Sequence, residues 1–225
     1  MNKRKYIWIS FMILITVIFL SVAVAAIRLQ VRTNRLSDDY QYLYQNADFA
    51  EPVCVSDVPV IKQEVSCGYA VLEMVAHWAG KNVTEESLYD AYGKVVTSTG
   101  KSFEKEMNKQ FPTYETTMYQ YETNSQMLEK IYNSLSEGIP VPFEWAAKTE
   151  GMWTLHYSLI TGLDFKSDEI TVCNPYGFTE VLPVASFLDR ASFDAYENMP
   201  MFLKLGFMFD VFEKNTIFIM EPADR

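Results

Sequence analysis

The chain has 225 residues, of which 49% are hydrophobic and 15% aromatic, enough for one globular domain with a sizeable core and an appendage. The first 35 residues contain six of the 19 basic residues and no acidic one, so the remainder carries 13 basic residues against 29 acidic ones. A body with this excess of negative charge should repel nucleic acid and anionic lipid. It could attract a cationic peptide, although the same charge also keeps an ordinary domain soluble.

An uncharged apolar segment, "IWISFMILITVIFLSVAVAAI", occupies residues 7–27. Its 21 residues are long enough to cross a bilayer as a helix. The alternative is a signal peptide, because Ala23 and Ala25 form an A-x-A pattern that a signal peptidase could cut. Since the apolar run is longer than the usual signal core, we expect a retained transmembrane anchor.

The numbers of basic residues on the two sides of this segment are nearly equal, so the positive-inside rule alone does not give its orientation. A short basic tail, residues 1–6, precedes the segment, and Arg28, Arg32 and Arg35 follow it. Because a basic tail is the usual start of an exported chain, we expect a single-pass protein of the cell membrane with an extracytoplasmic body. Secretion after signal cleavage is the alternative.

Residues 28–52 are polar and tyrosine-rich, and we interpret them as a stalk that leads to a domain over residues 53–225. Periodicity predicts helices at residues 67–79, 85–92, 102–111 and 125–136. Alternating, β-branched stretches then predict strands at residues 139–145, 154–164, 169–177 and 179–184. The tail adds a helical or strand-like stretch at residues 201–212 and a last strand at residues 215–220. Helices followed by strands are typical of an α+β domain.

Cys67 is the first residue of the first predicted helix. Ser66 before it is a good N-cap, and Val71, Met74 and Trp78 lie on one apolar stripe of that helix. The N–H groups and macrodipole of a helix N-terminus favour thiolate, which can lower the pKa of a cysteine well below its free value of about 8.5. Cys67 is therefore placed as a nucleophile. The alternative is a small buried thiol that merely starts a core helix.

A cysteine nucleophile needs a base, and the chain has only two histidines. His77 lies ten residues beyond Cys67 on the same helix, roughly 15 Å away, so it cannot take the thiol proton and we interpret it as a surface residue. Elimination leaves His156, near the start of an alternating strand.

The strand of His156 turns near residues 166–168 and returns as a second strand that ends at Asn174. In such a hairpin the start of one strand lies beside the end of the other, so His156 and Asn174 should lie together. The Asn174 carbonyl could accept the Nδ1 proton of His156 and leave Nε2 facing the thiol, the Cys, His, Asn arrangement of papain-like enzymes. Asn174 is also an ordinary turn former before Pro175, and both roles can hold together.

Four blocks now carry a resemblance: "DVPVIKQEVSCGYAVLEMVAHWAG", "EGIPVPFEW", "LHYSLITGLD" and "ITVCNPYG". In this order they resemble the bacteriocin-processing, double-glycine-leader cysteine peptidase family in its broad form, over about residues 53–190. The resemblance implies a papain-like α+β fold, with N-terminal helices packed on a C-terminal antiparallel sheet. The transmembrane helix expected from residues 7–27 precedes it. The resemblance also implies a thiol peptidase that cleaves a peptide or protein.

Carried over by position, the resemblance makes Cys67 the nucleophile, His156 the base and Asn174 the orienting residue. Gln63 would help the backbone N–H of Cys67 to hold an oxyanion. Two positions depart from the family. Gln63 precedes Cys67 by only four residues, and Asn174 stands where many relatives have Asp. No G-x-x-x-x-G-K-[ST] motif of a transporter ATPase occurs, so the leader-peptide substrate does not carry over.

The remaining cysteines bear on other functions. Cys173 should point into the core, away from its neighbour Asn174, and a bridge to Cys54 is a minor possibility. No cluster has metal-ligand spacing, so we expect neither metal nor cofactor. Two functions of different class survive: a membrane-anchored thiol peptidase, and a noncatalytic papain-like module that binds peptides or a surface partner. The sequence leaves the oligomeric state open.

Overall fold

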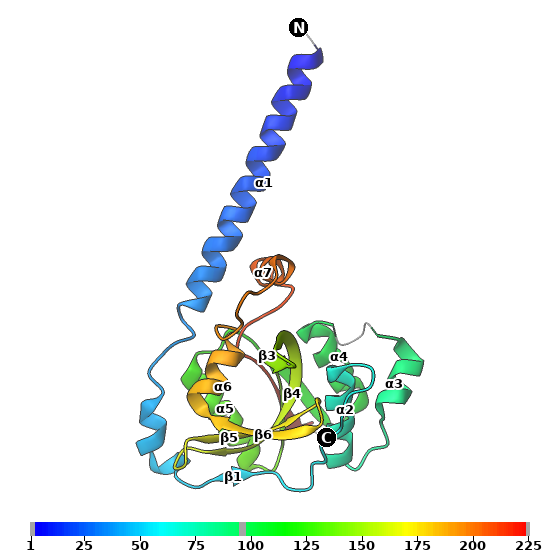
Figure 1. The fold of residues 1–225 in the computed structure, drawn as a ribbon, viewed down its shortest axis with the longest axis vertical. Helices are drawn as coiled ribbons and strands as arrows, with labels where there is room; N and C mark the ends of the chain where they lie inside the picture. The colour runs from blue at the N-terminus through cyan, green and yellow to red at the C-terminus, as the bar shows by residue number, and fades with distance from the viewer. Residues whose placement is uncertain (1–2, 95–97, 224–225) are drawn as a thin grey trace.

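A computed structural model describes residues 3–94 and 98–223 (Figure 1). One long helix, α1 (Lys3–Thr33), stands out from a body of helices and strands. Its residues from Tyr6 to Thr33 have a mean hydropathy of 2.7 over their most apolar stretch, none of which is buried in the body. The helix is therefore long and apolar enough to cross a membrane, and it contains the segment predicted to do so.

The body combines helices with an antiparallel sheet. Its helices are α2 (Cys67–Trp78), α3 (Glu85–Tyr92), α4 (Gly100–Gln110), α5 (Asn124–Ser136), α6 (Val184–Ala191) and α7 (Met201–Met208), with 3-10 turns η1 (Gln41–Gln45) and η2 (Ala47–Phe49). Its strands are β1 (Val53–Cys54), β2 (Tyr114–Tyr119), β3 (Val141–Thr149), β4 (Met152–Asp164), β5 (Glu169–Asn174), β6 (Phe178–Pro183) and β7 (Thr216–Pro222). The strand order is β2-β7-β3-β4-β5-β6, and β1 pairs with the end of β4. The predicted α+β class, with helices on an antiparallel sheet after one apolar helix, is confirmed.

The two faces of the sheet support two cores, because side chains alternate along each strand. Tyr157 and Leu159 of β4 face α2 and α4, where they pack with residues such as Phe103. Ile160 lies on the opposite face, in the core that α5 and α6 cover. This alternation places the side chain of His156 on the face opposite to that of its neighbour Tyr157.

Local capping explains where the helices begin. Thr84, Thr99 and Thr123 each form a capping box with the residue three positions later. Helices α3 and α5 therefore begin at or within one residue of the predicted position. Helix α4 begins at Gly100, two residues before the predicted start, because Thr99 is its N-cap.

One prediction for the C-terminal part needs correction. Residues 179–184 were expected as a strand, but β6 ends at Pro183, and Val184 begins α6, a helix that the sequence analysis did not predict. The helix forms because four residues at helical spacing become buried: Val184, Phe187, Leu188 and Ala191. The apolar stretch at residues 201–212 is helical over α7, and the expected last strand is β7.

The segment expected as a stalk, residues 28–52, is attached to the body along its second half. Helix α1 continues to Thr33, and beyond it Leu36 and Leu43 are buried. The backbone N–H of Ser125 in α5 donates to Asp38 at 2.9 Å. Buried leucines and this hydrogen bond thus attach residues 36–43 to the body, in a segment whose sequence shows no clear period.

Candidate active site

Helix α2 presents Cys67 at its first turn, as predicted. The side chain of the N-cap Ser66 accepts the backbone N–H of Tyr69 at 3.2 Å, which fixes the start of the helix. Cys67 keeps part of its surface exposed, whereas its thiol is enclosed and accepts a hydrogen bond from the backbone N–H of Tyr157. The thiol therefore lies against the strand residue that directly follows His156.

A buried carboxylate that the sequence analysis missed holds the loop before Cys67. Glu85 accepts the backbone N–H groups of three successive residues at 2.8, 2.8 and 2.6 Å: Glu64, Val65 and Ser66. The backbone N–H of Glu85 donates in turn to Glu73 at 2.7 Å. An acidic residue after the cap Thr84 is common in any first helical turn. The sequence therefore gives no sign that Glu85 bonds to the loop before Cys67.

The hairpin of β4 and β5 joins His156 to Asn174, as predicted. The Nε2 atom of His156 lies 3.0 Å from Oδ1 of Asn174, and both residues are buried, with 2% and 1% of their surface exposed. Oδ1 also accepts the backbone N–H of Tyr176, and the Asn174 amide nitrogen donates to Glu180. These bonds fix the amide with its oxygen toward the imidazole, so the Nε2 nitrogen carries the proton and donates.

The ring nitrogens are therefore used the other way round from the expectation. Nδ1 was expected to meet Asn174, but Nε2 does so, and Nδ1 is left as the unprotonated ring nitrogen. The register explains the difference, because it pairs Leu159 with Cys173 and so puts Asn174 two residues before the position directly opposite His156. The more distant ring nitrogen spans that diagonal. Tyr176, which the same register places opposite His156, stacks on its ring at 4.2 Å between centroids and 15° between planes.

Further residues buttress Asn174, and the sequence analysis singled out none of them. Glu180 on β6 accepts from the Asn174 amide at 3.2 Å and forms an ion pair with Arg190 of α6. Arg190 also donates to the backbone oxygen of Ala146 at 2.9 Å and lies over the ring of Trp145. The orientation of the imidazole thus depends on a chain of contacts from α6 to β5.

The loop that contains Gln63 docks on the turn after Asn174. The backbone N–H of Gln63 donates to the oxygen of Pro175 at 2.8 Å. Lys62 packs on Gly177, whose φ of 98° and tight contact, 3.2 Å from Lys62 Cγ to the position of a Cβ, both favour glycine. The side-chain Oε1 of Gln63 is buried and finds no hydrogen-bond partner among the described residues. His156 and Asn174 are thus joined directly, the Gln63 backbone bonds to the residue after Asn174, and Cys67 lies at the start of α2 against Tyr157, the residue after His156.

A thiolate–imidazolium ion pair would need a lowered pKa at Cys67 and a raised pKa at His156. Both pKa values shift in the opposite direction. Burial raises the pKa of Cys67 to about 11, and the charge of the Glu144 carboxylate adds to the rise. The hydrogen bond from the backbone N–H of Tyr157 opposes this rise. Burial lowers the pKa of His156 to about 4, opposed by the Asn174 hydrogen bond and assisted by the charge of Arg190. The expected lowering of the thiol pKa by the helix N-terminus is thus outweighed by burial. At neutral pH the site holds a thiol and an uncharged imidazole.

Glu144 is a fully buried carboxyl group beside this site. It pairs directly with Tyr157 across β3 and β4, and neither of its oxygens has a hydrogen-bond partner among the described residues. Burial raises the pKa of Glu144 well above its usual value, and the charge of Glu213 adds to the rise. A charged residue in the middle of an apolar strand could have signalled this group, but the sequence analysis did not use it.

The other candidate residues lie apart from the site. His77 is exposed in the last turn of α2, as predicted. All three cysteines are free, so Cys54 and Cys173 form no bridge. Cys173 is buried among the residues that pack on α2, which agrees with its predicted inward direction.

Comparison with known proteins identifies the family. A family model described as the Peptidase_C39 like family matches residues 55–199. The chain belongs to this family. The predicted resemblance is confirmed, and a cysteine peptidase-like function follows from it at the level of the family. Comparison with the curated proteins gives no match.

One solved structure similar to this chain is a double glycine motif protease from an AMS/PCAT transporter, in complex with the leader peptide. It is 20% identical, with a TM-score of 0.46, and the match covers 76% of this chain and 98% of that chain.

Proposed function

We propose that this chain is a membrane-anchored cysteine peptidase that cleaves a peptide or protein substrate. The observation that carries the proposal is the bond from His156 Nε2 to Asn174, which leaves Nδ1 as an acceptor. Cys67, at the N-terminus of α2, lies against Tyr157, the next residue in the strand. A nucleophile, a base and an orienting group in this relation are the requirements of acyl transfer through a thiol. Membership of a peptidase-like family supports the same reaction class.

In the proposed reaction, Nδ1 of His156 takes the thiol proton as the sulfur of Cys67 attacks the peptide carbonyl carbon. The resulting imidazolium returns the proton to the amine nitrogen as the carbon–nitrogen bond breaks, which leaves an acyl-enzyme. Water then attacks the thioester, gives one proton to Nδ1, and releases the acid and the thiol. Asn174 holds the ring throughout by accepting from Nε2.

The oxyanion of each tetrahedral intermediate needs donors that are already in place. The backbone N–H of Cys67 at the start of α2 is one candidate, and the side-chain amide of Gln63 is the other. Two sets of bonds support Gln63. The Glu85 carboxylate holds the backbone N–H groups of residues 64–66, a contact called the Glu85 clamp below, and the backbone N–H of Gln63 bonds to Pro175. Together they fix the backbone on both sides of the Gln63 side chain. In this assignment Gln63 binds the oxyanion and Glu85 positions the loop.

The neutral pair gives this site a particular requirement. Because the pKa of Cys67 is raised and that of His156 lowered, the thiol is deprotonated during attack rather than beforehand. The thiolate therefore forms only when a bound substrate carbonyl is in place for attack. The same observation favours the second candidate, a noncatalytic peptide-binding module, because a site that is never ionised would bind without cleaving.

For the anchor, we propose that α1 spans the cell membrane with its basic N-terminus inside, and that the body lies outside. The peptidase domain then begins soon after the helix, near residue 36, with no long spacer. The acidic body suits a cationic peptide or protein segment as substrate.

Labelling by a peptidyl chloromethyl ketone with basic side chains separates the two candidates. The full-length chain in detergent micelles is treated at neutral pH, and labelling of each cysteine is followed by peptide mass spectrometry, with exposed Cys54 as the internal reference. A peptidase should label at Cys67 faster than at Cys54, and His156→Ala should slow the Cys67 reaction on the order of 100-fold while His77→Ala leaves it unchanged. If Cys67 labels no faster than Cys54 and ignores His156, the binding module is the correct assignment.

A further inference from the structure

Helix α7 presents an apolar surface that the peptidase site does not use. Its sequence, "MFLKLGFM", contains one polar residue, Lys204. Met201 and Phe202 are 70% and 68% exposed, and Leu205 and the following Phe209 are also exposed. A helix that is apolar on all sides is normally buried in a protein core or in a membrane. Exposed clusters of large apolar side chains mark a contact surface.

The opposite side of α7 fastens it to the body. Leu203, Gly206 and Phe207 are buried, and Phe207 belongs to a small core with Ala146 of β3 and Phe193. Gly206 is required there, because a Cβ at this position would lie 2.3 Å from the ring of Phe212. The exposed face of α7 is therefore presented in a fixed direction, because the buried face locks the helix in place.

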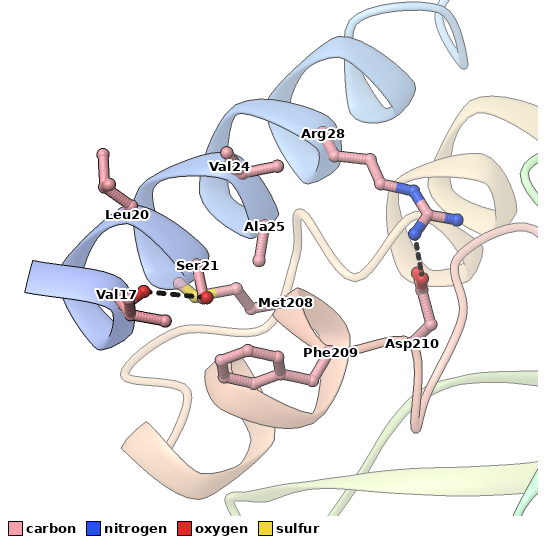
Figure 2. A pocket seen from close by; sticks show the side chains of 9 residues that line it. All are labelled: Val17, Leu20, Ser21, Val24, Ala25, Arg28, Met208, Phe209 and Asp210. Carbon is pink, nitrogen blue, oxygen red and sulfur yellow. Dashed lines mark hydrogen bonds and ion pairs between the residues drawn. The ribbon is translucent and has the colours of Figure 1, made fainter. Parts of the chain in front are cut away.

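The C-terminal end of α7 and the exposed Phe209 that follows it lie beside the second half of the apolar run of α1. Figure 2 shows Met208 and Phe209 next to the α1 segment that runs from Val17 to Arg28. Between the two helices is an open groove of about 550 Å³, lined on the α1 side by Val17, Leu20, Ser21, Val24, Ala25 and Arg28. At 1.5 Å per residue, Val17 lies about 15 Å along the axis from the end of the apolar run at Ile27.

A charged layer marks the level at which this apolar region ends. Arg28 and Arg32 both form ion pairs with Asp210, at 3.0 and 2.6 Å (Figure 2 shows the first). Leu29 of α1 packs on the same small core as Phe207. Helix α1 is thus tied to the segment after α7 just where its own apolar run gives way to basic residues.

We propose that α7 is a second membrane contact, which inserts its Met201, Phe202, Leu205 and Phe209 face into the lipid leaflet on the side of the body. This inference rests on the proposed anchoring of α1. If α1 spans the bilayer, the chain beside residues 17–27 lies at the depth of lipid, and that chain is α7. The occupant of the groove and of the exposed face is then lipid hydrocarbon, with the Arg28, Arg32 and Asp210 cluster at the headgroups.

The contact orients the candidate active site. Trp153 and Leu155, at the start of β4, pack on the same small core as Phe207. His156 follows directly in the chain, so it lies at the end of β4 nearer to α7. Held by α1 and α7 together, the body would keep this site near the bilayer surface, where its substrate would be a peptide segment close to the membrane.

The test measures the depth of nitroxide labels in the full-length chain, one copy per phosphatidylcholine nanodisc. In a background with the three native cysteines replaced by serine, labels are attached to Phe202→Cys, Leu205→Cys, Phe19→Cys in α1, and Val181→Cys, an exposed apolar position on β6. Collision with oxygen reports lipid, and collision with a water-soluble nickel chelate reports water. Circular dichroism and thermal unfolding confirm that each labelled chain is folded.

Labels at Phe202 and Leu205 should collide with oxygen in preference to nickel, at a depth of about 5–10 Å below the phosphates, whereas the Val181 label meets nickel. If the α7 labels meet nickel as readily as Val181 while Phe19 is in lipid, the α7 proposal fails and the anchor stands. If they are shielded from both reagents, protein covers the face, and the lipid assignment is wrong. If Phe19 itself meets nickel, the anchor fails and this inference fails with it.

Discussion

Replacing Glu85 by glutamine should loosen the loop that leads to Cys67. The carboxylate accepts three backbone N–H groups, one at Oε2 and two at Oε1, at 2.6 to 2.8 Å. In glutamine one oxygen becomes an NH₂ group that cannot accept, so at least one charge-assisted bond is lost and the others become neutral. A bond to a charged group contributes about 1.5–3 kcal/mol and a neutral one about 1 kcal/mol.

The expected loss for Glu85→Gln is therefore about 2 kcal/mol, because the loop is partly exposed and water replaces some of the lost bonding. For a chain of this length that corresponds to a fall in Tm of about 4–8 °C. Thermal unfolding of the full-length chain in micelles, followed by tryptophan fluorescence, measures it. Glu86→Gln is the matched control, since Glu86 is exposed on the same helix and should shift Tm little. Equal Tm values for the two variants would refute the clamp.

Three further outcomes are expected. Asn174→Ala should lower kcat on the order of 10–100-fold with little change in KM, measured on any cleaved peptide, because the imidazole loses its orienting acceptor. A rise in KM with kcat unchanged would instead argue for a role in substrate binding. Because the pKa of His156 is lowered to about 4 in the folded state, protons bind the unfolded chain more readily, and stability should fall as pH drops from about 6.5 to 4. His156→Gln should flatten that slope in unfolding measurements and His77→Gln should not. Gly206→Ala should destabilise α7 by about 1–3 kcal/mol and speed its proteolysis, since the new methyl meets Phe212; unchanged proteolysis would show that the ring moves freely.

The sequence predicts the parts of this fold that depend on local signals. Ser66 determines the start of α2 because a cap acts within one helical turn, and the alternation around His156 with a turn near residue 168 determines the β4–β5 hairpin. The pairing of His156 with Asn174 follows from that hairpin. The four sequence blocks around Cys67, residues 137–145, His156 and Asn174 also suffice to recognise the peptidase-like family.

What the sequence does not predict depends on contacts between distant elements. The choice of ring nitrogen at His156 depends on a diagonal in the strand register, which periodicity cannot resolve. The direction of the Cys67 pKa depends on burial by β4, and the Glu85 clamp depends on the packing of α3 against a loop nineteen or more residues earlier. Helix α6 was missed because Val184 continues a β-like run and only tertiary burial distinguishes the two states.

The pH dependence of Cys67 alkylation tests the central claim, a neutral thiol and imidazole pair, most directly. Iodoacetamide is added to the full-length chain in micelles, and the peptide that contains Cys67 is followed by mass spectrometry, with His156→Ala alongside. The account predicts an inflection near the pKa of about 11 for Cys67, together with a slower reaction at pH 7 when His156 is absent. An inflection below the free-thiol value of about 8.5 that rises in His156→Ala would show a preformed ion pair and contradict the account. Rates at pH 7 that ignore His156 would contradict its role as the base.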